Sequence, residues 1–288
     1  MKLNHIPILA QEIIEALAAD PEKIFVDGTT GGAGHSGMIL ETKPKHLYSF
    51  DQDLEVIKRH QSTENWTLVH SNFRHIWDYC KENQIKINGG ILLDLGLSSI
   101  QLDDPRRGFS FQQDCVLDMR MDQSLELTAA NVVNQYSEKD LADLIYQYGE
   151  ERKSRQIATA IVKNRPFETS AKLADLIKII YARGSSGKTF RIHPATRTFQ
   201  ALRIEVNQEL AALEELLELD FEVLQPGAVL AIISFHSLED RLVKNSFKKY
   251  AAEGKLELIC KKPITAGEIE LENNPRSRSA KLRLARVK

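Results

Sequence analysis

One stretch near the start of the chain decides the fold, Ile24-Phe25-Val26-Asp27-Gly28-Thr29-Thr30-Gly31-Gly32-Ala33-Gly34-His35-Ser36. An apolar run ends in an acid, a glycine-rich turn follows, and the apolar pattern resumes at Met38. This order is typical of a buried strand, a tight loop and the start of a helix. Glycine is needed where backbone approaches a ligand, and the first N–H groups of a helix favour an electron-rich ligand group. We therefore predict a nucleotide-type cofactor on the loop from Gly31 to His35, the alternative being a structural turn without a ligand.

The composition is that of an ordinary globular protein, with 288 residues of which 42% are hydrophobic and 27% charged. A net charge of -2 does not indicate a nucleic-acid-binding protein, so such a function must rest on local basic clusters. The three cysteines are far apart and form no disulfide framework, which favours a reducing compartment. No signal-peptide pattern and no apolar run of the roughly 20 residues that span a bilayer is present. We expect a cytoplasmic protein without membrane contact.

Strands that alternate with helices predict a parallel sheet covered on both faces. The strands that follow the first are predicted at Leu47–Asp51, Thr67–His70, Gly90–Gly96 and Ala228–Phe235. Two last strands, Leu256–Cys260 and Lys281–Val287, are close enough in sequence to pair antiparallel. A parallel core closed by an antiparallel pair is the arrangement of a class I methyltransferase, an α/β Rossmann-like fold. It favours S-adenosylmethionine as the cofactor, although Gly32 to Gly37 also matches the letters of the dinucleotide fingerprint.

The pattern changes to helices alone between Ser124 and Gly184, and a long helix is predicted from Thr198 to Leu219. We therefore predict a methyltransferase domain of residues 1–123 and 193–288. Residues 124–192 form an inserted all-helical domain, whose flexible exit is the stretch from Gly184 to Lys188.

Polar residues end four predicted strands and should line one crevice, because the carboxyl ends of parallel strands meet at one edge. They are Asp27, Asp51, Asn72 and Asp94. Asp27 with the glycine loop is expected to hold the amino-acid part of the cofactor. Asp51 lies about twenty residues beyond the loop, at the spacing of an acid that binds ribose hydroxyls. Phe73 is expected either beside the adenine or in the core. Asp94 is expected to face the reacting atom, with Gln101 within reach.

Three other patterns allow competing interpretations. Ser234 and His236, with Glu239 and Asp240, resemble hydrolase residues, but sequence neighbours rarely aim at one another and the two acids are expected to cap a helix. His5, His35, His193 and His236 have no metal-ligand spacing, so we predict no metal site. Two basic clusters favour either phosphate contact or a solvated face. They consist of Arg191, Arg197 and Arg203, and of Arg276, Arg278, Lys281, Arg283, Arg286 and Lys288.

Ten segments together resemble the bacterial ribosomal RNA small subunit methyltransferase H family, also called MraW. The matching segments are His5–Leu9, Asp27–Thr29, Gly34–Ser36, Gly90–Gly96, Arg107–Phe111, Leu117–Asp122, Tyr148–Glu151, His193–Ala201, Ile233–Arg241 and Asn274–Ser279. They cover nearly the whole chain, and several are long and idiosyncratic. The resemblance implies transfer of a methyl group from S-adenosylmethionine to the exocyclic N4 of a cytidine in the decoding region of 16S ribosomal RNA. It implies cofactor contacts at Ala33, Gly34, His35, Asp51, Phe73, Asp94 and Gln101.

The resemblance further implies that the helical insertion recognises the substrate, small-subunit ribosomal RNA in the assembled subunit. Three positions depart from the family pattern. Ala33 replaces a glycine, a change that fits if φ there is negative. Ile100 replaces a proline, and Cys115-Val116 replaces Gly-Pro, both at the expected rim of the site. The sequence indicates no oligomeric state and does not tell naked RNA from the assembled subunit as substrate.

The chemistry requires an oxygen acceptor for the amino N–H, because the lone pair of the cytosine amino group is conjugated with the ring. We predict Asp94 in that catalytic role, with the oxygens of Leu95 to Ser99 as alternatives. The cytosine must leave its stack, and Phe109 or Phe111 is predicted to support it. The competing functions are a methyltransferase that acts on a protein or small molecule, a cofactor-binding ribosome assembly factor without chemistry, and a NAD-dependent oxidoreductase.

Overall fold

The computed structural model describes residues 7–18, 20–111, 114–182 and 193–288. The chain divides into two compact units. The sheet unit comprises residues 1–98 and 210–288, and the helical unit comprises residues 99–209. Within the described ranges, no helix is long and apolar enough to cross a membrane.

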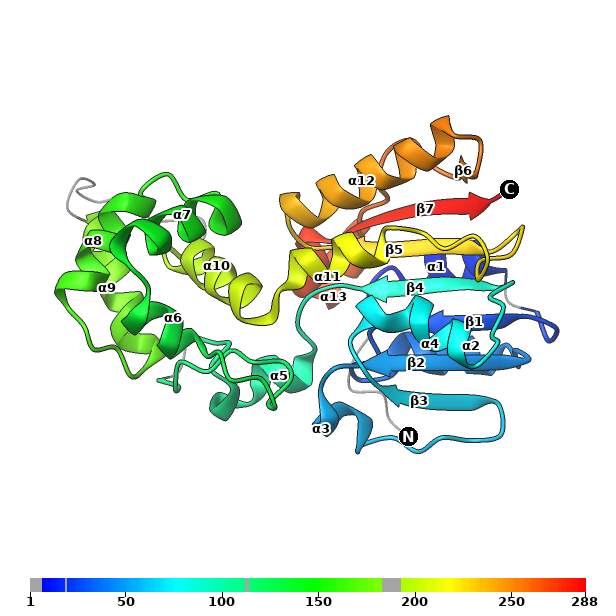
Figure 1. Cartoon of the computed structure of the whole chain (residues 1–288), viewed down its shortest axis with the longest axis horizontal. Helices are drawn as coiled ribbons and strands as arrows, with labels where there is room; N and C mark the ends of the chain where they lie inside the picture. Colours follow the sequence, from blue (N-terminus) through cyan, green and yellow to red (C-terminus); the bar gives the residue numbers. More distant parts are fainter. Residues whose placement is uncertain (1–6, 19, 112–113, 183–192) are drawn as a thin grey trace. The chain divides into compact units, whose positions relative to one another are not determined.

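The sheet unit is built on one seven-stranded sheet in the order β3-β2-β1-β4-β5-β7-β6. The strands are β1 (Ile24–Asp27), β2 (His46–Asp51), β3 (Trp66–His70), β4 (Gly90–Asp94), β5 (Val229–Ser234), β6 (Leu256–Leu258) and β7 (Lys281–Val287). Strands β1 to β5 are parallel, whereas β7 runs antiparallel to both β5 and β6 (Figure 1). The sequence prediction of a parallel core closed by an antiparallel pair is confirmed, and the fold is that of a class I methyltransferase.

Helices cover both faces of this sheet because its central strands are apolar on both sides. Phe25 and Val26 of β1, next to each other in sequence, belong to different buried clusters. One face packs against α4 (Ile76–Glu82), α11 (Glu209–Leu216) and α12 (Ser237–Ala252), and the other against α1 (Ala10–Leu17) and α2 (Gly34–Glu41). Alternation at a period of two residues sends successive side chains to opposite faces, so both clusters are fully apolar. The shorter elements are α3 (Leu54–Ile57), η1 (Phe73–His75), α13 (Glu268–Asn273) and η3 (Pro275–Ser279).

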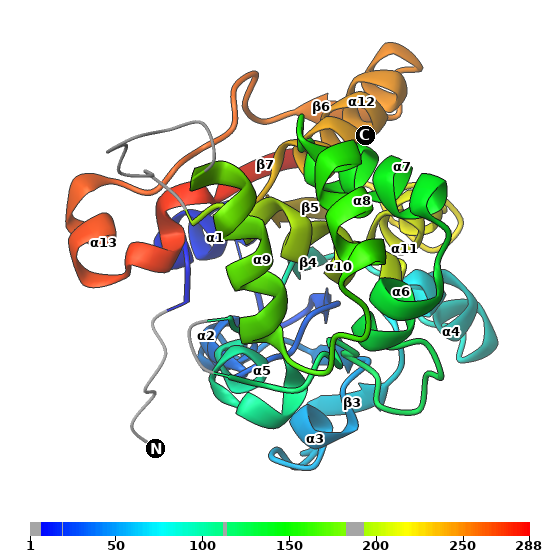
Figure 2. The same cartoon turned by 90° about the vertical axis from the view of Figure 1, so that its left-hand side faces the viewer.

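The helical unit contains the predicted insertion and more. Its elements are α5 (Ser99–Asp103), η2 (Pro105–Arg107), α6 (Ala129–Gln135), α7 (Glu138–Gly149), α8 (Ser154–Lys163), α9 (Ser170–Ala182) and α10 (Thr196–Asn207). Helix α7 packs against both α8 and α10, and Figure 2 shows all three helices from the side of this unit. Residues 99–123 and 193–209 therefore belong to this unit, whereas the sequence interpretation assigned them to the methyltransferase domain.

A break in one predicted helix explains where the helical unit ends. The expected helix from Thr198 to Leu219 is two helices, α10 and α11, because Gln208 between them has a φ of 51°. A left-handed residue cannot continue a right-handed helix. Asn207, the last residue of α10, is tied to the segment 119–121 by two hydrogen bonds, so α10 folds with that segment.

Candidate active site

The carboxylate of Asp27 at the end of β1 is enclosed by the protein itself. Asp27 is 1% exposed, its Oδ2 accepts a 2.6 Å hydrogen bond from Ser36 Oγ, and its Oδ1 accepts one from the Thr29 N–H at 3.0 Å. The hydroxyl of Ser49 in β2 lies 2.9 Å from Ser36 Oγ and accepts a hydrogen bond from the Trp66 ring N–H. Because Ser36 gives its only proton to Asp27, Ser49 must donate to Ser36. Asp27 is therefore linked through Ser36 to Ser49 of β2 and Trp66 of β3, and its predicted contact with the cofactor stays a prediction.

Asp51 at the end of β2 holds the glycine loop. Its Oδ2 accepts a hydrogen bond from the Gly31 N–H at 2.9 Å, and its Oδ1 accepts one from the Asp53 N–H at 2.9 Å. Burial raises the pKa of Asp51 to about 6. Each carboxylate oxygen has a second lone pair, so Asp51 can still accept a hydrogen bond from a ribose hydroxyl. That contact stays a prediction, but the structure adds a second task for Asp51, which is to shape the loop.

Asp94 at the end of β4 differs from both of these acids. Its backbone N–H donates to Thr29 Oγ1 at 2.7 Å, and its Oδ2 lies 3.6 Å from Nδ1 of His35. Its Oδ1 is buried and has no hydrogen-bond partner among the described residues. A buried polar atom without a partner costs about 1–3 kcal/mol, so such an atom in a native fold calls for an explanation. Asp94 is thus the strand-end acid with an open acceptor.

The His35 ring stands between Asp94 and the N-terminal segment. His35 is 7% exposed, and its Nε2 lies 2.9 Å from the carbonyl oxygen of Ile8, which can only accept. Nδ1 therefore faces the Asp94 carboxylate, and the contact is attractive when the pair shares a proton. Burial raises the pKa of Asp94 to about 6, the nearby carboxylates of Asp27 and Glu239 add to this, and His35 opposes it.

The loop that follows β1 is shaped by two residues of the predicted cofactor set. Gly34 cannot be replaced without movement, because a Cβ there would lie 2.8 Å from Cγ of Pro7. Ala33 has a φ of 56°, in the left-handed region. The sequence interpretation required a negative φ for alanine to fit in place of glycine, and that expectation is wrong. The loop keeps its left-handed turn and accepts the strain of a methyl group at this position.

Phe73 and Gln101 complete the predicted set. Phe73 begins η1 and packs partly against the core cluster, and a Cβ on Gly28 would lie 3.2 Å from its Cβ. It therefore has the core contacts of one interpretation, while its predicted contact with the adenine remains untested. Gln101 is buried in α5 of the helical unit, with Ile100 beside it, whereas the other predicted cofactor residues belong to the sheet unit. Its role stays a prediction.

The start of α12, directly after β5, carries a capping box that sequence reasoning identified only in part. His236 Nδ1 accepts a 3.4 Å hydrogen bond from the Glu239 N–H, and Glu239 Oε2 accepts from the N–H groups of Phe235 and His236. Glu239 is 2% exposed, so its predicted capping role is confirmed. Asp240 instead pairs with Arg283 at 2.7 Å and with Lys281 at 3.4 Å. The Ser-His hydrolase interpretation finds no support here, because the His236 ring is committed to the helix cap.

The two basic clusters separate into structural and exposed members. Arg203 forms two hydrogen bonds with Glu209, and Arg283 is held by Asp240, so both serve the fold. Five other members are exposed: Arg197, Arg276, Arg278, Arg286 and Lys288. Arg191 and His5 lie outside the described residues, as does the predicted exit at Gly184 to Lys188. Over the described ranges, no three His, Cys, Asp or Glu side chains gather in a metal-binding group.

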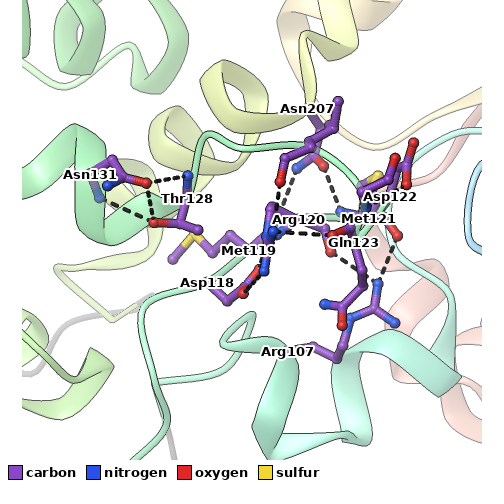
Figure 3. Close-up of polar contacts among 12 residues, drawn as sticks. Arg107, Asp118, Met119, Arg120, Met121, Asp122, Gln123, Thr128, Asn131 and Asn207 are labelled. Atoms are coloured by element: carbon purple, nitrogen blue, oxygen red, sulfur yellow. Dashed lines mark hydrogen bonds and ion pairs between the residues drawn. The ribbon is translucent and has the colours of Figure 1, made fainter.

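The segment from Leu117 to Asp122 in the helical unit has an unusual sequence because its polar residues form hydrogen bonds that hold the loop (Figure 3). Asp118 binds Arg120 through both carboxylate oxygens, at 2.9 Å and 2.7 Å. Asn207 accepts from the Met121 N–H at 2.7 Å and donates to the Met119 carbonyl at 2.8 Å. Arg107 Nη2 donates to the carbonyls of Arg120 and Met121. These residues fix a loop; a charged pair of this kind is satisfied without a ligand.

The aromatic residues predicted to support a flipped base both lie in the helical unit. Phe109 is 7% exposed. Phe111 stacks on His193, with ring centroids 4.7 Å apart, and meets Phe199 edge to face at 4.9 Å. The departure at Cys115-Val116 lies nearby in the chain, where Cys115 exchanges hydrogen bonds with Ser170. The unusual pair thus joins the loop to α9, and its effect on the site remains a prediction.

Comparison with known proteins identifies the family. A family model described as the MraW methylase family matches residues 2–288. The chain belongs to the MraW methylase family. Curated relatives named Ribosomal RNA small subunit methyltransferase H include the protein of Acaryochloris marina, 46% identical over 288 residues that cover 98% of this chain and 94% of the relative. The protein of Deinococcus deserti is 48% identical, covering 98% and 93%, and that of Synechococcus elongatus is 47% identical, covering 98% and 94%. The resemblance found in the sequence motifs is confirmed.

A methylase of this fold implies S-adenosylmethionine as the methyl donor, and the residues present fit it. The cofactor carries an ammonium group on its amino-acid part, and a buried carboxylate with a free oxygen is the natural partner for that group. Asp94 Oδ1 is such an atom. The glycine loop and Asp51 lie at the ends of the adjacent strands β1 and β2, where a class I fold binds its nucleoside.

Proposed function

We propose that this protein transfers the methyl group of S-adenosylmethionine to the exocyclic N4 of a cytidine in the decoding region of 16S ribosomal RNA, in the assembled small subunit. The single observation that carries the proposal in this chain is Asp94 Oδ1, an open buried acceptor at the end of β4. The substrate class comes from membership of the MraW methylase family and from the names of its relatives.

The cysteines support an amino group rather than a ring carbon as the acceptor. Methylation of pyrimidine C5 uses a thiolate that first adds to the ring, because the carbon alone is a weak nucleophile. Cys80 is fully buried in α4, and burial raises its pKa to about 12. Cys115 is 4% exposed in the helical unit, and Cys260 follows β6, the edge strand farthest from β3. The residues directly after β1, β4 and β5 therefore include no cysteine, whereas an amino group needs only an oxygen acceptor.

Bound S-adenosylmethionine supplies an electrophilic methyl group for in-line displacement. The chain must align the acceptor nitrogen and exclude water, and such positioning can supply several kcal/mol. The Gly31 loop, which Asp51 fixes through the Gly31 N–H, holds the cofactor, and Asp51 binds its ribose. Asp94 binds the ammonium group or accepts the amino N–H of the base, and a carbonyl or hydroxyl oxygen between Leu95 and Ser98 takes the other task. The base must leave its stack to reach these groups.

A tritiated-methyl transfer assay tests the proposal. The purified protein receives labelled S-adenosylmethionine and small subunits from a strain that lacks the gene, and the RNA is then digested to nucleosides. We expect label in N4-methylcytidine and in no other nucleoside. Label in another nucleoside, or in ribosomal protein, would disprove the acceptor. Tight cofactor binding without transfer would indicate an assembly factor instead.

The two tasks of Asp94 are separated by Asp94→Ala. If Asp94 accepts the amino proton, the variant turns over at least tenfold more slowly even with saturating cofactor, since general-base and hydrogen-bond effects are typically that large or larger. If Asp94 only holds the ammonium group, the Michaelis constant for the cofactor rises and turnover at saturation is retained.

A further inference from the structure

The ring of His236 is held rigidly at the point where β5 becomes α12. The side chain is 9% exposed. Its Nδ1 accepts the Glu239 N–H, while the Glu239 carboxylate accepts the backbone N–H of His236 in return. This reciprocal capping box fixes the ring relative to the first turn of a 16-residue helix. The ring therefore points its other nitrogen, Nε2, in one direction.

Nε2 of His236 is buried and forms no hydrogen bond with any described residue. A ring whose Nδ1 accepts a hydrogen bond carries its proton on Nε2 when neutral. Nε2 lies 3.2 Å from Glu239 Oε1, yet it makes no hydrogen bond with any described residue. A buried N–H of this kind costs about 1–3 kcal/mol if nothing completes it. An acceptor brought by a ligand would remove that cost.

The segment that carries this donor follows β5 and lies next to the end of β4, which carries the open acceptor of Asp94. Strands β4 and β5 are paired with Asp94 opposite Ile233, three residues before His236, and the Leu95 N–H donates to the Ile233 carbonyl at 3.1 Å. A Cβ on Gly96 would touch the Phe235 ring at 3.6 Å, so the segments that leave the two strands pack together. The Glu239 carboxylate also raises the pKa of Asp94, which places the α12 cap within electrostatic reach of it.

The edge of cytosine has the complementary pattern. Its exocyclic amino group donates, and the adjacent ring nitrogen N3 accepts; uracil presents the reverse, a carbonyl acceptor beside an N–H donor. We propose that His236 is a specificity-determining residue that donates from Nε2 to N3 of the target cytosine, while an oxygen at the end of β4 receives the amino group. This inference rests on the proposed function, because it names the base contact within the same site.

The Glu239 carboxylate beside His236 disfavours a phosphate group as the acceptor for Nε2. A phosphate would meet a buried negative charge at Glu239, which is 2% exposed, and a second at Asp94. A neutral acceptor such as a ring nitrogen meets no such repulsion. The start of α12 is thus suited to a base and not to the RNA backbone.

The test uses His236→Asn, because asparagine is among the best N-cap residues and keeps the acceptor for the Glu239 N–H while removing the Nε2 donor. Binding is measured by filter retention of labelled small subunits in the presence of S-adenosylhomocysteine, which prevents turnover. Two kinds of subunit are compared, one with the target cytidine and one with uridine in its place. Asn245→Ala, an exposed change on the same helix, is the matched control.

We expect the wild type and Asn245→Ala to bind cytidine subunits about 100-fold more tightly than uridine subunits, about tenfold for each of the two hydrogen bonds, at His236 and at the β4 oxygen. His236→Asn should lower affinity for cytidine subunits about tenfold and leave uridine subunits unchanged, so the preference falls about tenfold and the part due to the β4 oxygen remains. The unfolding temperature and the affinity for S-adenosylmethionine should stay at the wild-type values, which separates base recognition from a structural role.

Retention of the full wild-type cytidine preference by His236→Asn would overturn the proposal, as would an equal loss on both kinds of subunit. If His236→Asn does not fold, His236→Ser provides the same comparison with another good cap. Failure of the proposed function is recognised separately, since wild-type protein would then place no label in N4-methylcytidine in the transfer assay.

Discussion

Strands β1 and β4 each end in an acid, Asp27 and Asp94, and the protein satisfies the hydrogen bonds of only one of the two carboxylates. Both oxygens of Asp27 accept hydrogen bonds, one from the Ser36 hydroxyl and one from the Thr29 N–H, and the Ser49 hydroxyl lies within hydrogen-bond distance of Ser36. Asp94, one strand away, has a free buried oxygen. Burial raises the pKa of both acids. The fold therefore bears the cost of two desolvated carboxylates, but hydrogen bonds offset it internally only at Asp27. We therefore expect Asp27 at the end of β1 to contribute to stability and Asp94 at the end of β4 to bind a ligand.

The largest expected effect is on stability and concerns Asp27, whose oxygens both accept hydrogen bonds. Asp27→Ala removes the acceptors of the Ser36 hydroxyl and the Thr29 N–H and leaves buried donors without partners. We expect the free energy of unfolding to fall by about 3–4 kcal/mol, measured by urea denaturation. Asp20→Ala, an exposed acid before the same strand, should cost less than about 1 kcal/mol. A loss at Asp27 no larger than at Asp20 would contradict the role of Asp27 as a brace.

The second effect is on cofactor affinity and concerns Asp94, whose Oδ1 has no hydrogen-bond partner among the described residues. Asp94→Asn removes the charge that attracts the ammonium group, so affinity for S-adenosylmethionine should fall about 100-fold by titration calorimetry. The same variant should unfold at a higher denaturant concentration than the wild type, because a buried amide needs no desolvated charge and its N–H can donate to His35.

The opposite signs of these two changes distinguish Asp94 from Asp27. Destabilisation of Asp94→Asn to the extent expected for Asp27→Ala would mean that both strand ends are structural. Unchanged cofactor affinity would mean that the free oxygen of Asp94 serves another group. Asp20→Asn is the matched control and should alter neither quantity.

The pH dependence gives a third, smaller effect. The pKa of Asp94 is raised to about 6 by burial, so cofactor affinity should be constant above about pH 7 and fall, by up to tenfold per pH unit, as the carboxylate is protonated below 6. Stability of the free protein should move the other way. A carboxyl whose folded pKa is raised above 3.8 binds more protons when folded, so its contribution is largest at low pH and is lost as pH rises through 6.

Titration calorimetry between pH 5 and pH 8 and urea denaturation over the same range check both slopes. The Asp94→Asn variant supplies the control, because it cannot lose a carboxylate charge at this position. Any slope that remains in the variant is assigned to Asp51 and Asp27, because burial raises the pKa of both carboxyls. Parallel movement of affinity and stability with pH would contradict the assignment of the open acceptor to Asp94.

The sequence located these acids but not their tasks. Asp27, Asp51 and Asp94 were predicted at strand ends because each closes an apolar run, and the sheet places them there. Whether an acid is closed depends on partners from other elements, such as Ser49 in β2 and Trp66 in β3, which no local pattern connects to Asp27. Contacts of that kind are set by the register of neighbouring strands.

Local backbone geometry was the second limit of sequence reasoning. The break between α10 and α11 rests on one left-handed residue, Gln208, in a stretch whose apolar spacing continues through it. The orientation of His236 was equally hidden, because its residue type is consistent with a cap, a ligand or a hydrolase. Its reciprocal hydrogen bonds with Glu239 exclude the last of these and leave Nε2 open.

The smallest expected effect concerns Ala33, the residue with a left-handed backbone in the loop that follows β1. Ala33, with a φ of 56°, bears a strain of about 1 kcal/mol that glycine would not, while glycine makes the unfolded chain more flexible by a similar or smaller amount. Ala33→Gly should therefore raise the free energy of unfolding by about 0.5 kcal/mol.

Two controls in the same unit sharpen this test by urea denaturation. Ala18, with a φ of 43° at the end of α1, has the same strain away from the strand ends, so Ala18→Gly should give a similar gain. Ala252→Gly, in the right-handed last turn of α12, should lose stability. If the left-handed turn serves the cofactor, titration calorimetry should detect a change in affinity for Ala33→Gly alone. A gain in stability for Ala18→Gly and none for Ala33→Gly would mean that contacts within the loop offset the strain at Ala33. The strain would then have no role in cofactor binding.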